Sequence, residues 1–386
     1  MQLSSKGKVG LGVLAALVVI GLCAYGYQLI NGLGVTGMSN SVSWGLYITC
    51  FMFFVGLSAG GLIVASSAHV FHIESFKRVS LPAVIVSTVC ICCAGLFIFI
   101  DLGGIQRIWR MFVGLNVTSP LAWDMIVITC YLIINILDIV WMVKGKEEQV
   151  RKLSYVALPV AILVHSVTAW IFGLEIAKEG WYSAIMAPIF VASAMDSGLA
   201  LLLCALAGLK KAKLMDAGED LVANLARLLA TCIAIDAFFI GCELLTVIYP
   251  GTEAGSELIS IMTSGSTAPF FWFEIICGLL IPFVMLASDK RRRSQGVVIG
   301  ASVLVIIGVF CKRAWLLFSS FFMGANVSGA PGISGGSTLA RSAGGTDIWT
   351  TIATYAPTAF EVLITCGVIA LGIAAFVVLS KKLIKA

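Results

Sequence analysis

The chain has 386 residues, of which 60% are hydrophobic and only 12% are charged. This composition excludes an ordinary water-soluble domain, because too few polar residues remain to cover a surface in water. The formal net charge of +5 comes mainly from basic residues in short connecting segments. It therefore indicates topology in a lipid membrane and does not imply a nucleic-acid partner.

Ten apolar segments are long enough to cross a membrane as helices, which takes about 20 residues. In chain order they are expected near residues 8–30, 44–72, 81–102, 121–143, 154–176, 184–208, 221–249, 268–287, 296–322 and 359–380. Their long apolar runs do not alternate with polar residues, and backbone groups in lipid must be satisfied internally. The expected fold is therefore all-α, a polytopic membrane protein with ten transmembrane helices.

The basic residues predict how these helices are oriented. Connections on one side hold most of the 25 lysines and arginines, whereas those on the other side hold only Arg107, Arg110, Lys178 and Arg341. Basic loops are retained on the cytoplasmic side during insertion. A multi-pass protein of the cytoplasmic (inner) membrane with both termini in the cytoplasm is expected. The first segment is long for a signal peptide and lacks a cleavage pattern, which favours a retained helix.

Short matches indicate an internal repeat. "SPLAWD" begins the fourth segment and "APFFWFE" the eighth, each with a proline, a tryptophan three residues later and then an acid, Asp124 or Glu274. "GLSAGGL" in the second segment and "SAMDSGL" in the sixth are offset in the same way. An offset of four helices preserves orientation and predicts two parallel four-helix bundles, although such short matches also arise by chance.

The expected division of the chain follows from this repeat. Residues 1–40 form a first peripheral helix and outer loop, 41–180 the first four-helix bundle (helices two to five), 181–322 the second (helices six to nine), and 323–386 an outer loop and the last helix. The loop sequence "ANVSGAPGISGGSTLARSAGG" has too few apolar residues for its own core. It is expected to be mobile or ordered by a partner on the outer face.

Ionisable residues inside the expected spans are functional candidates, because a charge at the bilayer centre costs at least a few kcal/mol. His165, Asp196 and Asp236 lie near the middle of their helices. Glu243 lies two turns beyond Asp236, about 10 Å closer to the outer face. Other ionisable residues of the outer half are Asp101, Asp124, Glu274, Lys312 and Arg313. This distribution predicts a polar pocket that opens toward the outer leaflet, with structural pairing of Arg313 to Glu243 or Glu274 as the alternative.

A histidine, carboxyls and an arginine in such a pocket suit a quinone headgroup. Its two carbonyl oxygens need hydrogen-bond donors, and its redox cycle exchanges two protons, which imidazole and carboxyl groups can carry. An arginine stabilises negative charge there. Trp44, Tyr47 and Trp123 are candidate ring walls, with the interfacial aromatic belt as the more common role for such residues.

The histidine and cysteine patterns argue against a metal or haem site. Two b-type haems need four axial histidines, and the chain has three, His69, His72 and His165. The twelve cysteines lie mainly inside helices and resemble small buried hydrophobes. Electrons are therefore expected to be exchanged with a partner on the outer side. Asp138, His69 and His72 are interpreted as ordinary residues near the inner interface, with an inward proton path as the alternative.

Motifs spread over several helices resemble the NrfD/PsrC family of polysulfide reductase membrane subunits. They are "VSWGLYITCFMFFVGLSAGG", "IDLG", the "HS" at 165–166, "GCELL", "FFWFEI" and "KRAW". The resemblance covers roughly residues 40–322. Ten helices and this length are closer to the family's longer branch, which includes membrane subunits of periplasmic hydrogenases, alternative complex III and sulfate-reducer redox complexes.

The resemblance implies a menaquinone or ubiquinone site near the outer face, with no haem or iron–sulfur cluster in this chain. It also implies an extracytoplasmic ferredoxin-like iron–sulfur subunit docked over that site, and a catalytic subunit of molybdopterin, hydrogenase or multihaem cytochrome type. Carried onto this chain, the catalytic residues are His165, Asp196, Glu243 and Arg313. The quinone-binding residues are His165, Trp44, Tyr47, Asp101, Asp124, Trp123 and Glu274.

The expected function is therefore that of a quinone-binding membrane subunit of an oxidoreductase complex, which is not a complete enzyme alone. It exchanges electrons between quinone and the outer iron–sulfur subunit, with proton uptake or release. A secondary transporter is the competing hypothesis, because buried charges and an internal repeat also suit a substrate or proton path. A purely structural anchor is a third.

Overall fold

The computed structural model describes residues 5–39, 41–323 and 354–384. Within these ranges ten helices are long and apolar enough to cross a membrane, and no strand occurs. The predicted all-α polytopic fold is thus confirmed. The glycine- and serine-rich outer stretch, with Arg341, lies outside the described residues, so its expected mobility or ordering stays a prediction.

The spans follow the predicted segments closely. They are α1 Ser5–Asn31, α2 Leu46–Val70, α3 Glu74–Asp101, α5 Pro120–Val143, α6 Glu147–Gly173, α7 Met186–Lys211, α8 Glu219–Ile248, the composite span α10 Ala268–Trp272, η3 Phe273–Leu280 and α11 Ile281–Leu286, then α13 Gln295–Phe322 and α15 Ala359–Leu383. Short helices lie in the connections: η1 Leu33–Val35, η2 Ile105–Arg107, α4 Arg110–Val113, α9 Glu253–Thr263 and α12 Asp289–Arg292.

The composite span departs from a regular α-helix in its middle, where η3 is a π-helix. Pro282 follows η3 and has no N–H to donate to the carbonyl of Gly278, which weakens the regular ladder of hydrogen bonds. π-Helical segments occur frequently at functional sites. Here the segment carries Glu274.

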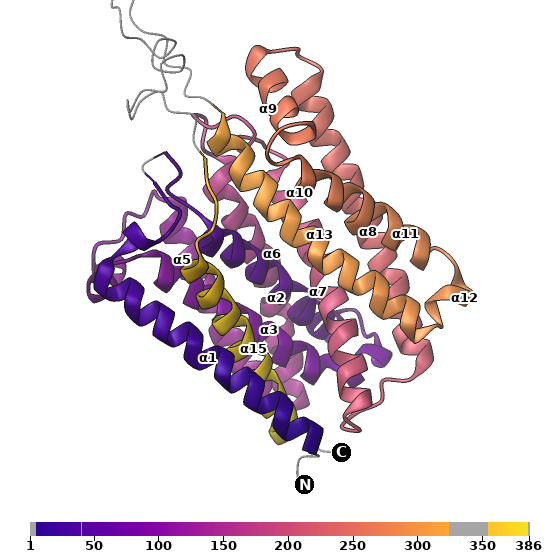
Figure 1. Ribbon diagram of the computed structural model, residues 1–386. Helices are drawn as coiled ribbons and strands as arrows, with labels where there is room; N and C mark the ends of the chain where they lie inside the picture. The colour runs from indigo at the N-terminus through magenta and orange to yellow at the C-terminus, as the bar shows by residue number, and fades with distance from the viewer. Residues whose placement is uncertain (1–4, 40, 324–353, 385–386) are drawn as a thin grey trace, which may run out of the picture.

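The helices pack in two groups around α2 and α7 (Figure 1). The first group is α2, α3, α5 and α6, and the second is α7, α8, the composite span and α13. α2 also packs on α7 and α13. Of the most apolar 18-residue stretch of α2, 89% is buried, whereas only 11% of the corresponding stretch of α1 is buried. α1 and α15 pack on each other at one edge. The groups consist of the helices of the two predicted bundles; the residue boundaries between them stay a prediction.

Glycines allow the closest helix contact between the two groups. A Cβ atom on Gly60 of α2 would lie 2.6 Å from the Cα atom of Gly198 of α7, so neither position accepts a side chain. Small residues let helix backbones approach in a membrane, where packing replaces the hydrophobic effect as the driving force. These glycines belong to "GLSAGGL" and "SAMDSGL", which places the repeated motifs at the centre of the molecule.

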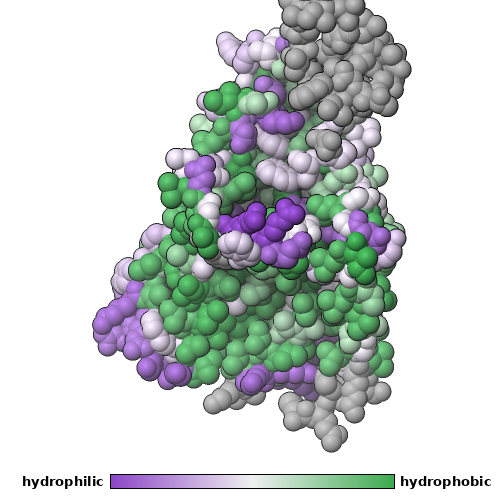
Figure 2. Space-filling model, turned by 90° about the vertical axis from the view of Figure 1, so that its left-hand side faces the viewer, coloured by the Kyte–Doolittle hydropathy of each residue, from purple (hydrophilic) through white to green (hydrophobic). Residues whose placement is uncertain are grey.

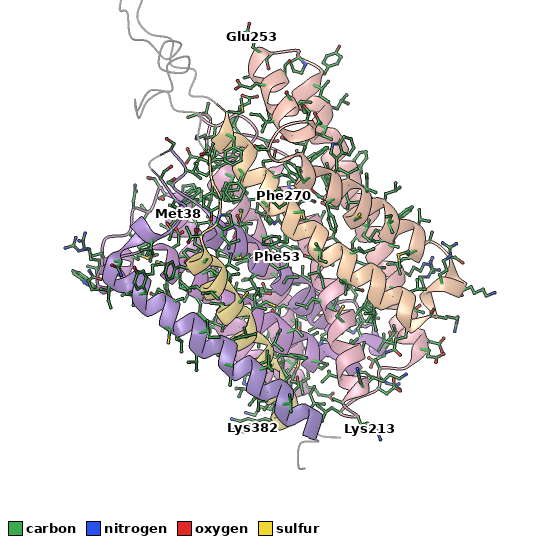
Figure 3. The ribbon with its side chains drawn as sticks, viewed as in Figure 1. Met38, Phe53, Lys213, Glu253, Phe270 and Lys382 are labelled. Atoms are coloured by element: carbon green, nitrogen blue, oxygen red, sulfur yellow. The ribbon has the colours of Figure 1, made fainter. Side chains whose placement is uncertain are left out.

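The two ends of the bundle differ in their charges. α1 begins and α15 ends at the same end, here named the basic end, and Figure 3 shows Lys213 and Lys382 there, opposite Glu253. The opposite end, here named the far end, includes α9. Figure 2 shows a broad hydrophobic region between bands of hydrophilic residues on one face. Such a band fits the hydrocarbon layer of a membrane.

Candidate functional site

A large cavity with polar groups in its wall lies within the first group, toward the far end. Its volume is about 560 Å³, within the range of small-molecule sites in proteins. Residues from α2, α3, α5 and α6 line it, and most of them are apolar. Trp44, Asp101 and Asp124 are in its wall, so the structure brings three of the predicted quinone-binding residues together.

The two carboxyl groups of the cavity form no ion pair with any basic side chain of the described part. Asp124 lies one turn into α5, which starts at Pro120, and its side chain is 3% exposed. The hydroxyl of Thr168 on α6 donates to its Oδ1 atom at 2.6 Å. Asp101 is the last residue of α3, and its buried Oδ1 atom has no hydrogen-bond partner among the described residues. Both carboxyls are therefore available to a ligand in the cavity.

Aromatic rings form the wall of the cavity near the far end. The ring of Trp44, just before α2, stacks on that of Trp181 at 6.0 Å and meets Phe172 edge-on at 5.7 Å. Two other lining side chains, Phe99 of α3 and Leu121 of α5, are 39% and 56% exposed. The cavity therefore reaches the apolar outer surface at α3 and α5.

Tyr47 and Trp123 are not among the residues that line this cavity. The Tyr47 hydroxyl donates to the Oε1 atom of Gln28 at 2.6 Å, which ties α2 to α1. The indole of Trp123 donates to the carbonyl of Val117 at 2.6 Å and fixes the loop before α5. Both residues thus make structural hydrogen bonds next to the cavity.

A closed cluster of charged side chains lies in the second group. The Lys312 ammonium on α13 is 2.5 Å from Asp236 of α8 and 3.1 Å from Glu274 of η3, and all three side chains are at most 1% exposed. The indole of Trp315 donates to the second oxygen of Glu274. Glu274 therefore belongs to this cluster and is not in the cavity wall. Asp196 of α7 lies within electrostatic range of Asp236 and Lys312, although neither of its oxygens has a hydrogen-bond partner in the described part.

Arg313 faces the interface between the groups. Its guanidinium donates to the hydroxyl of Ser193 at 2.6 Å and stacks over the ring of Phe190 at 3.9 Å. The side chain is fully buried, and its Nε and Nη1 atoms have no partner among the described residues. Arg313 pairs with neither Glu243 nor Glu274 in the described part of the chain, so the anticipated structural ion pair is not formed.

His165 is buried in α6. It is 2% exposed, and neither ring nitrogen has a hydrogen-bond partner in the described residues. Arg313 is within electrostatic range of it. Three residues further along α6 is Thr168, which holds Asp124, and residues at that spacing share one helix face. His165 does not line the cavity, and Thr168 binds Asp124 in the cavity wall.

Glu243 is separated from these residues. It lines a small cavity between α8, α9 and α13, and it accepts a hydrogen bond from the hydroxyl of Ser183 at 2.6 Å. Lys312 lies in the wall of the same small cavity. The four predicted catalytic residues, His165, Asp196, Glu243 and Arg313, are thus distributed over three adjoining environments.

Several residues of these sites were not anticipated. Thr168 binds a cavity carboxyl, Ser193 and Phe190 hold Arg313, and Trp315 binds Glu274. The spacing of Thr168 from His165 was an available signal for the first of them. Phe190 and Ser193 had none, because an apolar helix with small polar residues is ordinary in a membrane.

Among the described residues no group of three or more histidine, cysteine or acidic side chains is arranged to hold a metal ion. His69 and His72 lie at the end of α2 and just after it, toward the basic end. The expectation that the chain holds neither haem nor an iron–sulfur cluster stays a prediction.

Comparison with known proteins gives a consistent group of relatives. The family model "Polysulphide reductase, NrfD" matches residues 34–324. The chain is 36% identical to a putative membrane subunit of dimethyl sulfoxide reductase from Halobacterium salinarum, over 96% of this chain and 90% of the relative. It is 29% identical to the "Hdr-like menaquinol oxidoreductase integral membrane subunit" of Archaeoglobus fulgidus, over 79% and 77%. It is 23% identical to the "Probable Ni/Fe-hydrogenase 2 b-type cytochrome subunit" of Escherichia coli, over 96% and 91%.

Proposed function

Because the chain belongs to the NrfD family of polysulphide reductase membrane subunits, we propose that it is the quinone-binding membrane subunit of an oxidoreductase complex. The observation that carries the proposal is the cavity of the first group. Its volume, its apolar walls, its opening toward lipid and its two unpaired carboxyls fit a quinone with an isoprenoid tail. Menaquinone is the favoured quinone, because the Archaeoglobus relative is named for menaquinol.

Different residues of the cavity have different proposed roles toward the bound quinone headgroup. The quinone itself supplies the two-electron redox chemistry. Asp124 and Asp101 exchange protons with its oxygens as general acids or bases. Thr168 orients Asp124, and Trp44 with Phe172 forms a wall for the ring.

His165 and Arg313 do not line the cavity, and their proposed effect on the quinone is indirect. The buried imidazole passes protons to and from the Asp124 side, and the Arg313 charge sets the field in which it does so. For Asp196 and Glu243 we propose proton exchange in the second group, because neither residue lines the cavity. The resemblance to the family placed all four residues around the quinol and its proton route.

The far end is the proposed docking face for the redox partner. Trp44 and the mouth of the cavity lie toward that end, so an extracytoplasmic ferredoxin-like iron–sulfur subunit docked there reaches the quinone over a short distance. A catalytic subunit of molybdopterin, hydrogenase or multihaem cytochrome type completes the complex; the names of the relatives support such assemblies. The basic end, with both termini, then faces the cytoplasm.

The proposal is tested by filling the cavity. Gly95 lines it, and a Cβ atom there meets no heavy atom within 4 Å, so Gly95→Phe places a ring in or at the mouth of the space. Binding of a short-chain menaquinone analogue to the purified complex is measured by fluorescence quenching. We expect at least about a tenfold loss of affinity, as for a ligand group displaced from a packed pocket. Gly12→Phe on α1, also in open space, is the matched control.

The outcomes separate the hypotheses. If the Gly95→Phe protein binds the analogue as tightly as the parent, the quinone does not bind in this cavity. A parent complex that binds no quinone at all would contradict the proposed function and favour a transporter, with the charged cluster as its substrate or proton site.

A further inference from the structure

An apolar groove lies in the second group, between α8 and the composite span. Its volume is about 420 Å³, and its walls come from residues 233–244 of α8 and 275–283 of the composite span. All the residues that line it are isoleucine, leucine, alanine, glycine or phenylalanine. Leu280 and Phe283 in its wall are 58% and 40% exposed, so the groove is open on the side of the bundle. It therefore fits a hydrocarbon chain that enters from the lipid.

The groove runs beside the closed cluster of charged side chains. Ile233 and Ile240 of its wall lie three residues before and four residues after Asp236, so all three are on the same side of α8. Ile275 of the opposite wall directly follows Glu274. An occupant of the groove therefore covers the lipid side of the cluster.

An arginine on α8 lies between this groove and the basic end. Arg227, Ala234 and Gly241 are seven residues apart, which is close to two helical turns, so they share one face of the helix. Ala234 and Gly241 line the groove. The Arg227 side chain is exposed, and no acidic side chain of the described residues forms an ion pair with it. Arg227 thus stands unpaired at the basic-end mouth of the groove.

The depth of Arg227 corresponds to the edge of the hydrocarbon layer. α8 has 30 residues and begins at Glu219. At 1.5 Å per residue it is about 45 Å long, whereas the hydrocarbon layer is about 30 Å thick, so a centred helix extends about 7 Å beyond each edge. Arg227 lies about 12 Å from the start of α8, and its Cα atom is then about 5 Å inside the layer. An exposed arginine at this depth extends its guanidinium toward the lipid phosphates.

Two more unpaired cations border the same end of the groove. The Arg291 guanidinium donates to the carbonyl of Val284 at 3.1 Å, and Val284 follows Phe283 of the groove wall. Lys290 next to it is exposed. In the described part of the chain neither forms an ion pair, in contrast to the two arginines that follow. Basic pockets between transmembrane helices bind anionic lipid headgroups. Cations and groove are thus arranged in the order of a headgroup and its hydrocarbon chain.

We propose that an anionic phospholipid binds here, with its phosphate at Arg227 and Arg291 and one hydrocarbon chain in the groove between α8 and the composite span. Residues 275–283 of the groove wall cover about 12 Å of depth, close to the roughly 15 Å that the hydrocarbon of one leaflet occupies. The lipid belongs to the leaflet at the basic end. Its site is separate from the quinone cavity, which lies in the first group.

The test measures lipid binding to the intact complex after delipidation in detergent. Phosphatidylglycerol is added, bound lipid is counted by native mass spectrometry, and the unfolding temperature is recorded in parallel. The parent is expected to hold one tightly bound lipid, and Arg227→Gln to bind it about tenfold more weakly, as for loss of a charge-assisted hydrogen bond. Arg151→Gln, which changes an exposed arginine of α6, is the matched control and is expected to bind the lipid as the parent does.

A second variant tests the groove separately from the headgroup contact. Ala234 lines the groove and is exposed, so Ala234→Phe places a ring where the chain lies. It is expected to weaken the binding of phosphatidylglycerol by a similar factor and to reduce the rise in unfolding temperature that the lipid gives the parent. Ala16→Phe, which changes an exposed alanine of α1, is the control.

Several results would contradict the proposal. Equal affinity of Arg227→Gln and the parent would show that the phosphate does not bind at Arg227. Equal binding of a diacylglycerol with the same chains, which lacks the phosphate, would show that the site does not select an anionic lipid. If Arg227→Gln does not assemble, Ala234→Phe must show the loss, or the proposal fails. A protein subunit cross-linked into the groove in place of lipid also overturns it. These results leave the quinone function untouched, because analogue binding is measured at the other group.

Discussion

Asp124 in the first group and Glu274 in the second stand at matching places in the repeat but have opposite surroundings. Each follows a tryptophan whose indole donates to a backbone carbonyl ahead of the span: Trp123 to Val117 in a loop at 2.6 Å, and Trp272 to Thr263 at the end of α9 at 2.9 Å. Asp124 then faces an open cavity, whereas Glu274 is enclosed with Lys312 and Trp315. The same tryptophan hydrogen bond therefore precedes an acidic residue in both groups. The helix that packs against the acidic residue determines whether its carboxyl group faces a cavity or is enclosed in an ion pair.

The neighbour is α6 in one case and α13 in the other. α6 offers Asp124 a single neutral hydroxyl, which leaves the carboxyl able to exchange a proton. α13 offers Glu274 a buried cation, which holds the carboxyl group in an enclosed ion pair. The comparison predicts that changes in the cluster reduce stability, while changes around the cavity reduce activity.

The largest effect is expected for Lys312→Met. Removing the cation leaves the charges of Asp236 and Glu274 buried without a partner, which typically costs about 3–5 kcal/mol. Thermal unfolding of the purified protein in detergent measures the loss. The double variant with Asp236→Asn is expected to recover part of it, because one of the uncompensated charges is removed. A single variant as stable as the parent would refute the structural role of the cluster.

Asp124→Asn is expected to act on activity. The amide keeps the size of the side chain and an acceptor for Thr168, but it carries no exchangeable acidic proton, so turnover of the intact complex with quinone should fall about 100-fold. Unfolding temperature should stay within a few degrees of the parent. A large loss of stability with normal specific activity would show that Asp124 has a structural role, and would contradict the contrast with Glu274.

Thr168→Val is expected to have an intermediate effect. It removes one hydrogen bond to Asp124, worth about 1 kcal/mol, and so lowers turnover roughly fivefold by leaving the carboxyl less well oriented. Steady-state kinetics with a menaquinone analogue measures the change. Equal turnover in the variant and the parent would show that Asp124 needs no support from α6.

The smallest effect is expected for Tyr47→Phe. Loss of the bond to Gln28 should cost about 1 kcal/mol of stability and should leave quinone affinity and turnover unchanged, because Tyr47 does not line the cavity. Thermal unfolding and analogue binding measure the two quantities. A clear drop in the affinity for the quinone analogue would show that Tyr47 contributes to the quinone site, as the sequence predicted.

The positions of the spans along the chain were predictable from the sequence because hydrophobic length is a local property. All ten segments were found, most of them within a few residues of their bounds, but α3 and α6 begin at Glu74 and Glu147, about two turns before the predicted starts at 81 and 154. The composite span was predicted as one helix, and its π-helical middle was not anticipated, although Pro282 was a local signal for an irregular helix.

The depth of each ionisable residue was also predictable, since it follows from its distance to the helix ends. Which residues meet was not. Asp101 and Asp124 share a cavity, whereas Glu274 and Glu243 at similar depths are in other places. Helices in lipid are apolar on their buried and exposed faces alike, so a local pattern does not reveal how each is rotated.

Helix number and depth are thus local quantities that the residue order already contains. The open cavity and the closed cluster depend on contacts between helices distant in sequence, such as α2, α6, α7 and α13. Those contacts are set by close packing at positions such as Gly60 and Gly198, where absent side chains allow the two groups to meet. Only the tertiary structure decides them, because each requires the shape of a partner helix distant in sequence.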